Sequence, residues 1–149
     1  MAGKTPKKKV RPGVDRTGRS ELHYAAAEGD LKKVEELIAA GNSVSLADDN
    51  GWTPLHFAAQ ARSHSVAKVL LAAGAPVDAQ DSHGNTPLLR AVFSSCGEGD
   101  LIALLRLHGA DPYLENAHGQ SPIGLARLIA NYPIEQFFND LPPTTDPAS

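Results

Sequence analysis

The chain has 149 residues, 42% of them hydrophobic, and a formal net charge of −3, values that suit one ordinary soluble domain. No apolar run approaches the roughly 18 residues of a membrane span, and residues 1–12 lack the hydrophobic core of a signal peptide. The single cysteine, Cys96, excludes an internal disulfide, so we expect a cytoplasmic protein without a membrane partner.

Residues 1–14 form a basic arm that we expect to be disordered in the free protein. Through Arg19 the chain carries seven basic residues and one acid, whereas residues 20–149 carry seven basic and sixteen acidic residues, a net charge of −9. The charge run and two prolines make the arm hard to bury. The run Lys7-Lys8-Lys9-Val10-Arg11 is similar to a short nuclear import signal and could also touch nucleic acid. A purely solubilising arm is the alternative.

A pattern repeats every 33 residues from residue 15 onward, with Gly18, Gly51 and Gly84 in register. Each glycine suits a tight turn with positive φ, and a Thr two residues later suits the cap of a helix that starts with Pro. A second helix follows, for which Gly41, Gly74 and Gly109 provide the C-terminal stop. We therefore divide the chain into units 15–47, 48–80, 81–115 and 116–141, the last a degenerate cap, and expect residues 142–149 to be a flexible tail.

These residues resemble the ankyrin repeat family, whose signature is a turn, Thr-Pro-Leu-His-x-Ala and two antiparallel helices in 33 residues. The resemblance covers residues 15–141 and is clearest at Thr53-Pro54-Leu55-His56-Phe57-Ala58. It implies an all-α solenoid of four helix-turn-helix pairs with short β-turn fingers, whose terminal units act as caps. Because one unit cannot bury its apolar face alone, the units must stack.

Residues with catalytic or metal-binding chemistry do not form a convincing site in the sequence. His23 and His56 occupy the histidine position of the family signature, where the resemblance implies a structural role in joining adjacent turns. Cys96 has no predictable activating neighbour. His83 and His118 precede glycines in successive turns, and two ligands without a third make a poor zinc site. We therefore expect no enzyme activity, catalytic residue, cofactor or metal.

The resemblance implies a concave groove, lined by the turn tips and the exposed side of the first helices, that binds another protein. Trp52 and Phe93 stand out in it, because exposed aromatic residues are enriched in binding hot spots. Alternatively, Trp52 folds back over an adjacent turn, and Phe93 packs beneath a local insertion. The predicted partner-binding residues are Arg16, Arg19, Asp49, Asn50, Trp52, Gln60, Ser82, His83, Asn85, Arg90, Phe93, Ser94, His118 and Gln120.

The third unit departs from the repeat twice. Gly84 and Gly119 are 35 residues apart instead of 33, and the two extra residues fall between the helices, near residues 94–99. Arg90 also replaces the aromatic residue that Tyr24 and Phe57 provide in the preceding units. Repeat insertions commonly fall on a functional face, although simple drift in a tolerated loop would give the same pattern.

The third and fourth units resemble small bacterial ankyrin proteins encoded beside secreted or contact-delivered toxins. This second resemblance rests on Ala91-Val92-Phe93, His108-Gly109-Ala110-Asp111-Pro112, Asn116-Ala117-His118-Gly119, Leu125-Ala126-Arg127 and Phe137-Phe138. It implies an immunity protein that neutralises a cognate toxin by occlusion. The alternative is a general adaptor or regulatory scaffold, which the basic arm would direct to the nucleus. The acidic stack favours a partner with a basic surface and disfavours nucleic acid, and we expect a monomer.

Overall fold

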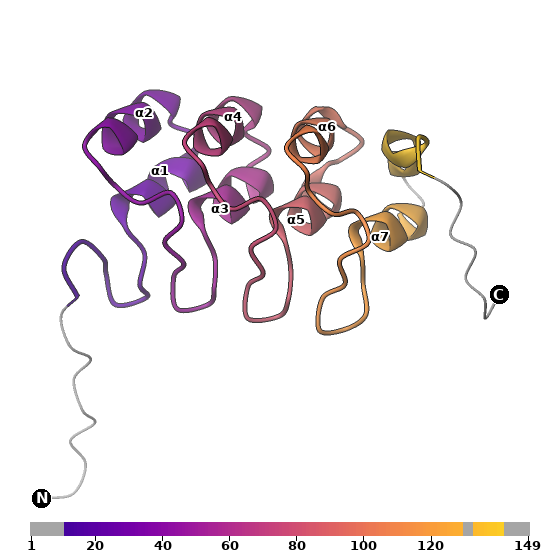
Figure 1. Ribbon diagram of the computed structural model, residues 1–149, viewed down its shortest axis with the longest axis horizontal. Helices are drawn as coiled ribbons and strands as arrows, with labels where there is room; N and C mark the ends of the chain where they lie inside the picture. The colour runs from indigo at the N-terminus through magenta and orange to yellow at the C-terminus, as the bar shows by residue number, and fades with distance from the viewer. Residues whose placement is uncertain (1–10, 130–132, 142–149) are drawn as a thin grey trace, which may run out of the picture.

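The computed structural model describes residues 11–129 and 133–141, which form a stack of helix pairs (Figure 1). Its elements are α1 Glu21–Glu28, α2 Leu31–Ala39, α3 Pro54–Gln60, α4 His64–Ala72, α5 Pro87–Ser94, α6 Asp100–Leu107, α7 Pro122–Leu128 and the 3-10 helix η1 Ile134–Phe138. No strand occurs within these described ranges, so the predicted all-α architecture is confirmed. In the part of the chain that is described, no helix combines the length and apolar character required to cross a bilayer.

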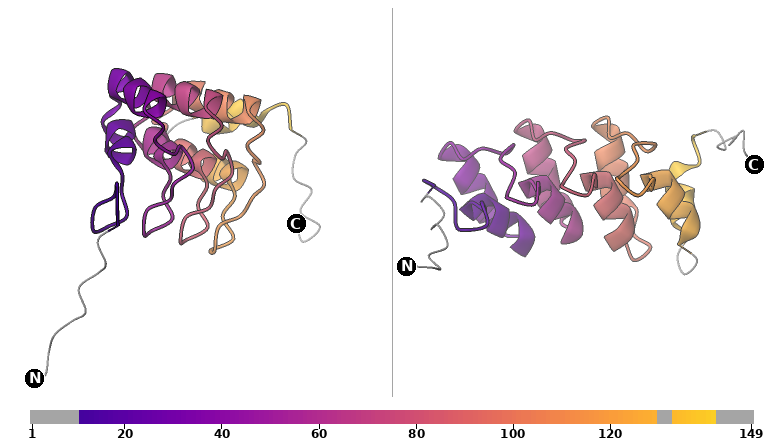
Figure 2. Two further views of the ribbon diagram at one scale, coloured as in Figure 1. Left: turned by 60° about the vertical axis from the view of Figure 1, so that its left-hand side comes forward. Right: turned by 90° about the horizontal axis from the view of Figure 1, so that it is seen from below.

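The helices stack in two layers. The first helices α1, α3, α5 and α7 form one layer, the second helices α2, α4 and α6 form the other, and each helix packs against its equivalent in the next unit. The segments that join the units leave the layers toward one side as a row of narrow turns (Figure 2). This row and the first-helix layer meet at an angle and enclose the concave side of the molecule.

One register position of the first helices holds their layer together. The aliphatic side chains at this position are buried, with exposed fractions of 0% for the three leucines and 1% for the isoleucine of the last unit: Leu22, Leu55, Leu88 and Ile123. Burial of such a side chain contributes about 1.5–3 kcal/mol relative to leaving it exposed. The concave side is therefore built on a continuous apolar row.

A hydroxyl residue caps the first helices of the later units, as predicted. The side chain of Thr86 accepts a hydrogen bond from the backbone N–H of Leu89 at 3.2 Å, and Ser121 accepts one from Gly124 at 3.0 Å. Each of these helices has Pro at its first position. Proline loses no hydrogen bond there, because the first N–H groups of a helix lack partners within it. The capped helix starts fix where each turn joins its helix.

The turn glycines serve both conformation and close contact. Gly51 has a φ of +81° and Gly119 one of +75°, in the left-handed region that favours glycine. A Cβ on Gly51 would lie 2.8 Å from the Cα of Asp81 in the next turn, whereas a Cβ on Gly119 would meet nothing within 4 Å. The backbone N–H of Ser82 also donates to the carbonyl of Asn50 at 2.8 Å. Successive turns therefore pack backbone against backbone.

The loop between the two helices is longest in the third unit. It comprises residues 95–99, compared with 29–30 in the first unit and 61–63 in the second. Cys96 is exposed and left-handed, with a φ of +50°, and Gly97 follows at +91°. Gly99 lies against the ring of Phe137, since an added Cβ would be 2.1 Å from that ring. The extra residues thus reach the C-terminal end of the stack.

Contacts at the N-terminal end begin before residue 15. The guanidinium of Arg11 donates to both carboxylate oxygens of Asp49, at 2.8 and 3.1 Å. Arg11, in the segment 1–14 predicted to be a disordered arm, therefore contacts the turn of the second unit, and the extent of that arm stays a prediction. The rest of that arm, residues 1–10, and the predicted tail, residues 142–149, lie outside the described residues.

At the C-terminal end, η1 takes the place of a second helix. Ile134 and Phe138 are buried against the core. The guanidinium of Arg106 donates to both carboxylate oxygens of Asp140 at 2.7 Å and to the carbonyl of Phe137 at 2.9 Å. The short helix is thus held onto α6 by a bidentate ion pair and closes the apolar end of the stack.

Candidate functional site

A polar side chain shapes each turn from within. One carboxylate oxygen of Asp48 accepts the backbone N–H groups of Asn50 and Trp52, both at 2.9 Å. Asp81 and Asn116 make the same two bonds, also at 2.9 Å, in the next two turns. These bonds fix the backbone that carries the side chain just before each helix cap. The residues at this position are Arg19, Trp52, Asn85 and Gln120.

Two buried histidines join adjacent turns. The Nδ1 atom of His56 accepts the backbone N–H of Thr53 at 3.1 Å, which leaves the ring proton on Nε2. Nε2 donates that proton to the carbonyl of Asn85 in the next turn at 2.8 Å. His23 makes the equivalent two bonds in the first unit, both at 3.0 Å. The geometry matches the structural role that the ankyrin resemblance implies for both residues.

The environment of these histidines keeps them neutral. Neither ring has exposed surface. Burial lowers the pKa of His23 and of His56 below the usual value near 6.5, because the charged form would lose its hydration. A second ring proton would also point at a backbone N–H donor. The turns of the first three units are therefore tied by uncharged hydrogen bonds.

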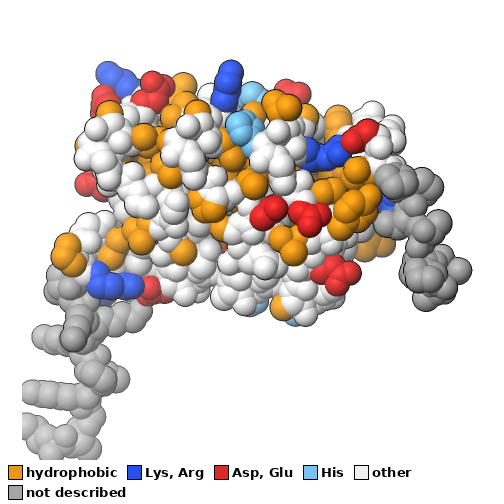
Figure 3. All heavy atoms as spheres, viewed as in Figure 1, with side chains coloured by type: hydrophobic (Ala, Val, Ile, Leu, Met, Phe, Trp, Pro, Cys, Tyr) orange, Lys and Arg blue, Asp and Glu red, His pale blue; other side chains and the backbone are white. Residues whose placement is uncertain are grey.

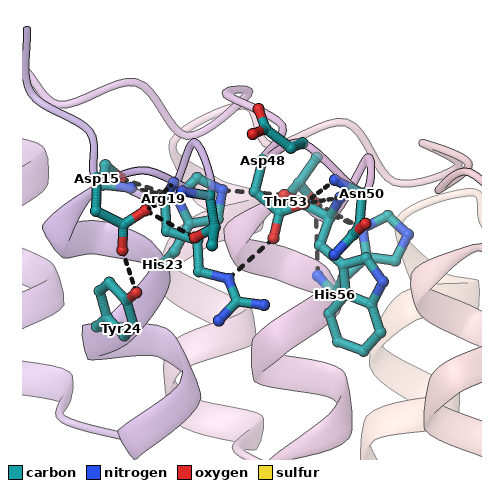
Figure 4. Close-up of polar contacts among 12 residues, drawn as sticks. Asp15, Arg19, His23, Tyr24, Asp48, Asn50, Thr53 and His56 are labelled. Carbon is teal, nitrogen blue, oxygen red and sulfur yellow. Dashed lines mark hydrogen bonds and ion pairs between the residues drawn. The ribbon is translucent and has the colours of Figure 1, made fainter. Parts of the chain in front are cut away.

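In the first two units the other oxygen of the turn acid meets a side chain from outside its own turn, and the partner differs between the units (Figure 4). In the first unit the hydroxyl of Tyr24 donates to Asp15 and, with further hydrogen bonds, holds the pKa of that carboxyl well below its usual range. In the second unit the partner is Nε of Arg19, which donates to Asp48 at 3.1 Å. The guanidinium of Arg19 also lies 5.1 Å from the ring centre of Phe57.

In the third unit Arg90 is the partner of the turn acid Asp81, but the two groups are farther apart than Arg19 and Asp48. One terminal nitrogen of Arg90 lies 3.6 Å from the outer oxygen of Asp81, too far for a hydrogen bond. Among the described residues, that oxygen and the Nε atom of Arg90 are buried without a hydrogen-bond partner. The guanidinium instead stacks on Trp52, 4.6 Å from the ring centre. Arg90 is thus oriented by an aromatic ring rather than by hydrogen bonds.

Two adjoining hollows lie along the concave side and share Arg90. The larger has a volume of about 410 Å³ and is lined by Arg19, Asn50, Trp52, Phe57, Gln60, Ser82, His83 and Arg90. The smaller has a volume of about 330 Å³ and is lined by Asn85, Leu89, Arg90, Phe93, Asn116, His118, Gln120 and Leu125. Eleven of the fourteen predicted partner-binding residues line these hollows, and Arg16, Asp49 and Ser94 do not.

Trp52 is not a solvated tip residue. It is half-buried, and its ring centre lies 4.8 Å from that of Phe57 and 5.7 Å from that of His56. Arg90 covers it from the next unit. Neighbouring residues therefore cover much of the indole, as the alternative interpretation of a folded-back ring expects. The indole still lines the larger hollow, so part of it is available for a partner.

Phe93 does not pack beneath the insertion loop, which was the alternative that the sequence left open. Its side chain is 70% exposed at the last turn of α5 and lines the smaller hollow. Leu128 on α7, at the equivalent position one unit later, is also 70% exposed. Exposed large apolar side chains of this kind mark interaction sites. The C-terminal half of the concave side therefore carries the more exposed apolar surface.

Four residues that line the hollows were not predicted from the sequence: Phe57, Leu89, Asn116 and Leu125. Phe57 and Leu125 occupy the position of Arg90 in their own units, so the repeat alignment contained the signal for them. Leu89 and Asn116 occupy the positions of the signature histidine and the turn acid. No sequence signal shows that these two residues line a hollow in the later units.

The polar residues of the described chain lie apart from one another and serve other contacts. In the two described ranges, no group of three or more His, Cys, Asp or Glu side chains is placed to hold a metal ion. His83 lines the larger hollow and His118 the smaller one. Asp49, predicted to contact a partner, is already bound by Arg11. The concave side thus offers arginine, amide and aromatic groups for recognition.

Comparison with known protein families agrees with this geometry. A family model described as ankyrin repeats in three copies matches residues 22–126, which is more than half of the chain. A search of curated proteins gives no match. Ankyrin repeats are a module for protein–protein interaction, in keeping with the turns and first helices that line the hollows. The chain belongs to the ankyrin repeat family.

Proposed function

We propose that the concave side binds a cognate toxin in the cell that produces both proteins, and that the chain is an immunity protein that neutralises the toxin by occlusion. The two adjoining hollows between Arg19 and Leu125 carry the proposal for a binding surface. The toxin as partner is supported by the resemblance of the third and fourth units to ankyrin proteins encoded beside toxins. The protein would act in the cytoplasm as a monomer.

The summed charge supports a partner with a basic surface. Residues 20–149 carry a net charge of −9, and a field of this sign accelerates encounter with a positively charged protein. The association rate should fall as the salt concentration rises, because screening shortens the range of the field. An association rate insensitive to salt would contradict this part of the proposal.

Co-expression of the chain with a toxin-like protein encoded by an adjacent reading frame tests the proposed function. We expect cell growth to be restored and the two proteins to elute as one complex. Phe93→Ala should weaken the complex at least tenfold, as typical of an aromatic hot spot, with little change in melting temperature because the side chain is 70% exposed.

The matched control is Leu107→Ala. Leu107 is 83% exposed but lies on α6, in the other helix layer, so its removal should leave binding unchanged. Equal loss of binding in both variants would show that the contact is not confined to the concave side. A complex that forms without restoring growth would contradict occlusion of the toxin.

The basic run at residues 7–11 favours a second function, that of an adaptor or regulatory scaffold carried to the nucleus. Of this run, only Arg11 lies within the described residues, where it binds Asp49. Fluorescence imaging of the tagged chain in a nucleated cell separates the two functions. Nuclear accumulation that disappears when the lysines are replaced by glutamine would support the adaptor.

A further inference from the structure

We propose that the larger hollow receives the carboxylate of an aspartate or glutamate side chain from the partner protein, bound by Arg90 and Arg19, while the smaller hollow receives an adjacent apolar side chain. The inference rests on the proposed use of the concave side and names the chemistry of the partner segment that enters it.

Arg90 is oriented but unsatisfied. A guanidinium has five N–H donors in a rigid fork, yet among the described residues that of Arg90 donates no hydrogen bond within 3.5 Å. Its plane is held by Trp52, 4.6 Å from the ring centre, and its side chain is 24% exposed. A carboxylate is the acceptor whose two oxygens match this fork. The terminal nitrogens are therefore suited to an acidic side chain.

Arg19 adds a second positive charge to the same hollow. Asp48 binds it through Nε, and this bond does not use the terminal nitrogens of the guanidinium. The side chains of Asp48 and Asp81 are only 1% and 0% exposed, so they anchor the arginines from beneath. No carboxylate lines the larger hollow itself. An incoming acid thus meets two guanidinium groups and no exposed negative charge.

The smaller hollow has a different character. Leu89, Phe93 and Leu125 supply apolar lining, and Arg90 forms the wall that it shares with the larger hollow. A segment whose acid reaches Arg90 therefore places a neighbouring side chain beside Phe93, which is 70% exposed. Burial of an apolar group at this point adds to the affinity and fixes the direction of the segment.

The local charge differs from the summed charge of the stack. Exposed acids such as Glu35 and Glu36 lie on α2, in the other helix layer, where acidic side chains are visible in Figure 3, and Asp111 lies in the segment between α6 and α7. They set the long-range field, whereas the arginines set the contact inside the hollow. A partner with a basic surface overall can therefore present one acidic side chain at this site.

Selection from a random peptide library displayed on phage tests the inference with the full chain. We expect the enriched peptides to share an Asp or Glu next to a large apolar residue. The enrichment should disappear with Arg90→Gln and persist with Lys68→Gln, since Lys68 is exposed on α4 away from the hollows. Enriched peptides without an acid, or no enrichment, would overturn the inference.

Stability needs a separate control, because Arg90→Gln leaves the buried carboxylate of Asp81 without a counter-charge. The double variant Arg90→Gln, Asp81→Asn removes this problem, and the fourth unit already has Asn116 at the position of Asp81. The double variant should melt as a folded protein and still fail to enrich acidic peptides. If it enriches them as well as the unmodified chain, Arg90 does not bind the acid.

Trp52 provides a direct readout, since it is the only tryptophan of the chain and lies under Arg90. Titration with the enriched peptide should change the Trp52 emission, and replacement of its acid by the uncharged amide should weaken binding at least tenfold. Equal affinities would overturn the inference. They would leave the proposed function intact if Phe93→Ala still weakened the toxin complex, so the two failures are distinguishable.

Discussion

The junction between the second and third units and the junction between the third and fourth are built on the same backbone but joined by different chemistry. At the former, His56 is fully buried and donates to the carbonyl of Asn85. At the latter, Leu89 occupies the histidine position, and the amide of Asn116 donates to the side chain of Asn85 at 2.8 Å. The hydrogen bond from a side chain to the backbone at the first junction is thus replaced, at the second, by apolar packing and a hydrogen bond between two side chains.

The two halves also differ in what they expose. The large apolar side chains that are at least 70% exposed within the described residues, Phe93, Leu107 and Leu128, all belong to the third and fourth units. The first two units instead hold the buried histidines and the close Arg19–Asp48 ion pair. The buried polar ties therefore lie in the N-terminal half, and the most exposed apolar side chains in the C-terminal half.

The largest expected effect concerns the turn glycines. Gly51→Ala should destabilise the protein by about 3 kcal/mol or more, because a left-handed Ala costs about 1–2 kcal/mol and its Cβ would also lie 2.8 Å from the backbone of Asp81. Gly119→Ala should destabilise the protein by about 1–2 kcal/mol, the cost of the left-handed conformation alone, because nothing lies within 4 Å of its added Cβ. Urea unfolding of both variants measures the difference. Equal losses would mean that the contact between turns contributes nothing.

A smaller effect should appear with pH. The pKa values of His23 and His56 are lowered by folding, so the unfolded chain binds more protons and stability falls as the pH drops below about 6.5. Each histidine contributes a slope of up to about 1.4 kcal/mol per pH unit. Melting temperatures between about pH 7.5 and 5.5 check this.

The control for the pH effect is His56→Leu, which copies Leu89 of the third unit. This variant should be less stable at neutral pH, because the carbonyl of Asn85 loses its donor, and it should have about half the pH slope. An unchanged slope would assign the pH dependence to other groups.

The smallest effect concerns left-handed residues in the loops between helices. Arg62 has a φ of +56° at the position where the first unit has Gly29 at +69°. Arg62→Gly should therefore stabilise the protein by up to about 1 kcal/mol. Cys96→Gly, in the third unit at a φ of +50°, should gain less, because the five-residue loop can relax. A larger gain at Cys96, measured by thermal melting, would show that the longer loop is the more strained one.

The elements that could be predicted from the sequence are those fixed by local chemistry. Thr53-Pro54 and Thr86-Pro87 mark helix starts because cap and proline act within a few residues. The buried row from Leu22 to Ile123 follows from the repeat period alone. These signals need no knowledge of which side chain from another unit lies nearby.

The side-chain contacts between units could not be predicted in this way. Arg19 reaches Asp48 from the preceding turn, whereas Arg90 approaches Asp81 from α5, the first helix of the same unit. Nothing in the local sequence determines which of these arginine positions pairs with the turn acid. Trp52 is half-buried because Phe57, His56 and Arg90 all reach its ring. The partners of a groove residue depend on the neighbouring unit, so its exposure does not follow from its position in the motif.

The short helix η1 has a consequence for how this protein behaves at high concentration. Each unit of the stack is made to receive another unit on its open face, and such a head-to-tail contact does not close on itself. Ile134 and Phe138 fill that face after α7, held there by Arg106 and Asp140. The 3-10 helix therefore covers the face on which an open filament of chains joined end to end would otherwise grow.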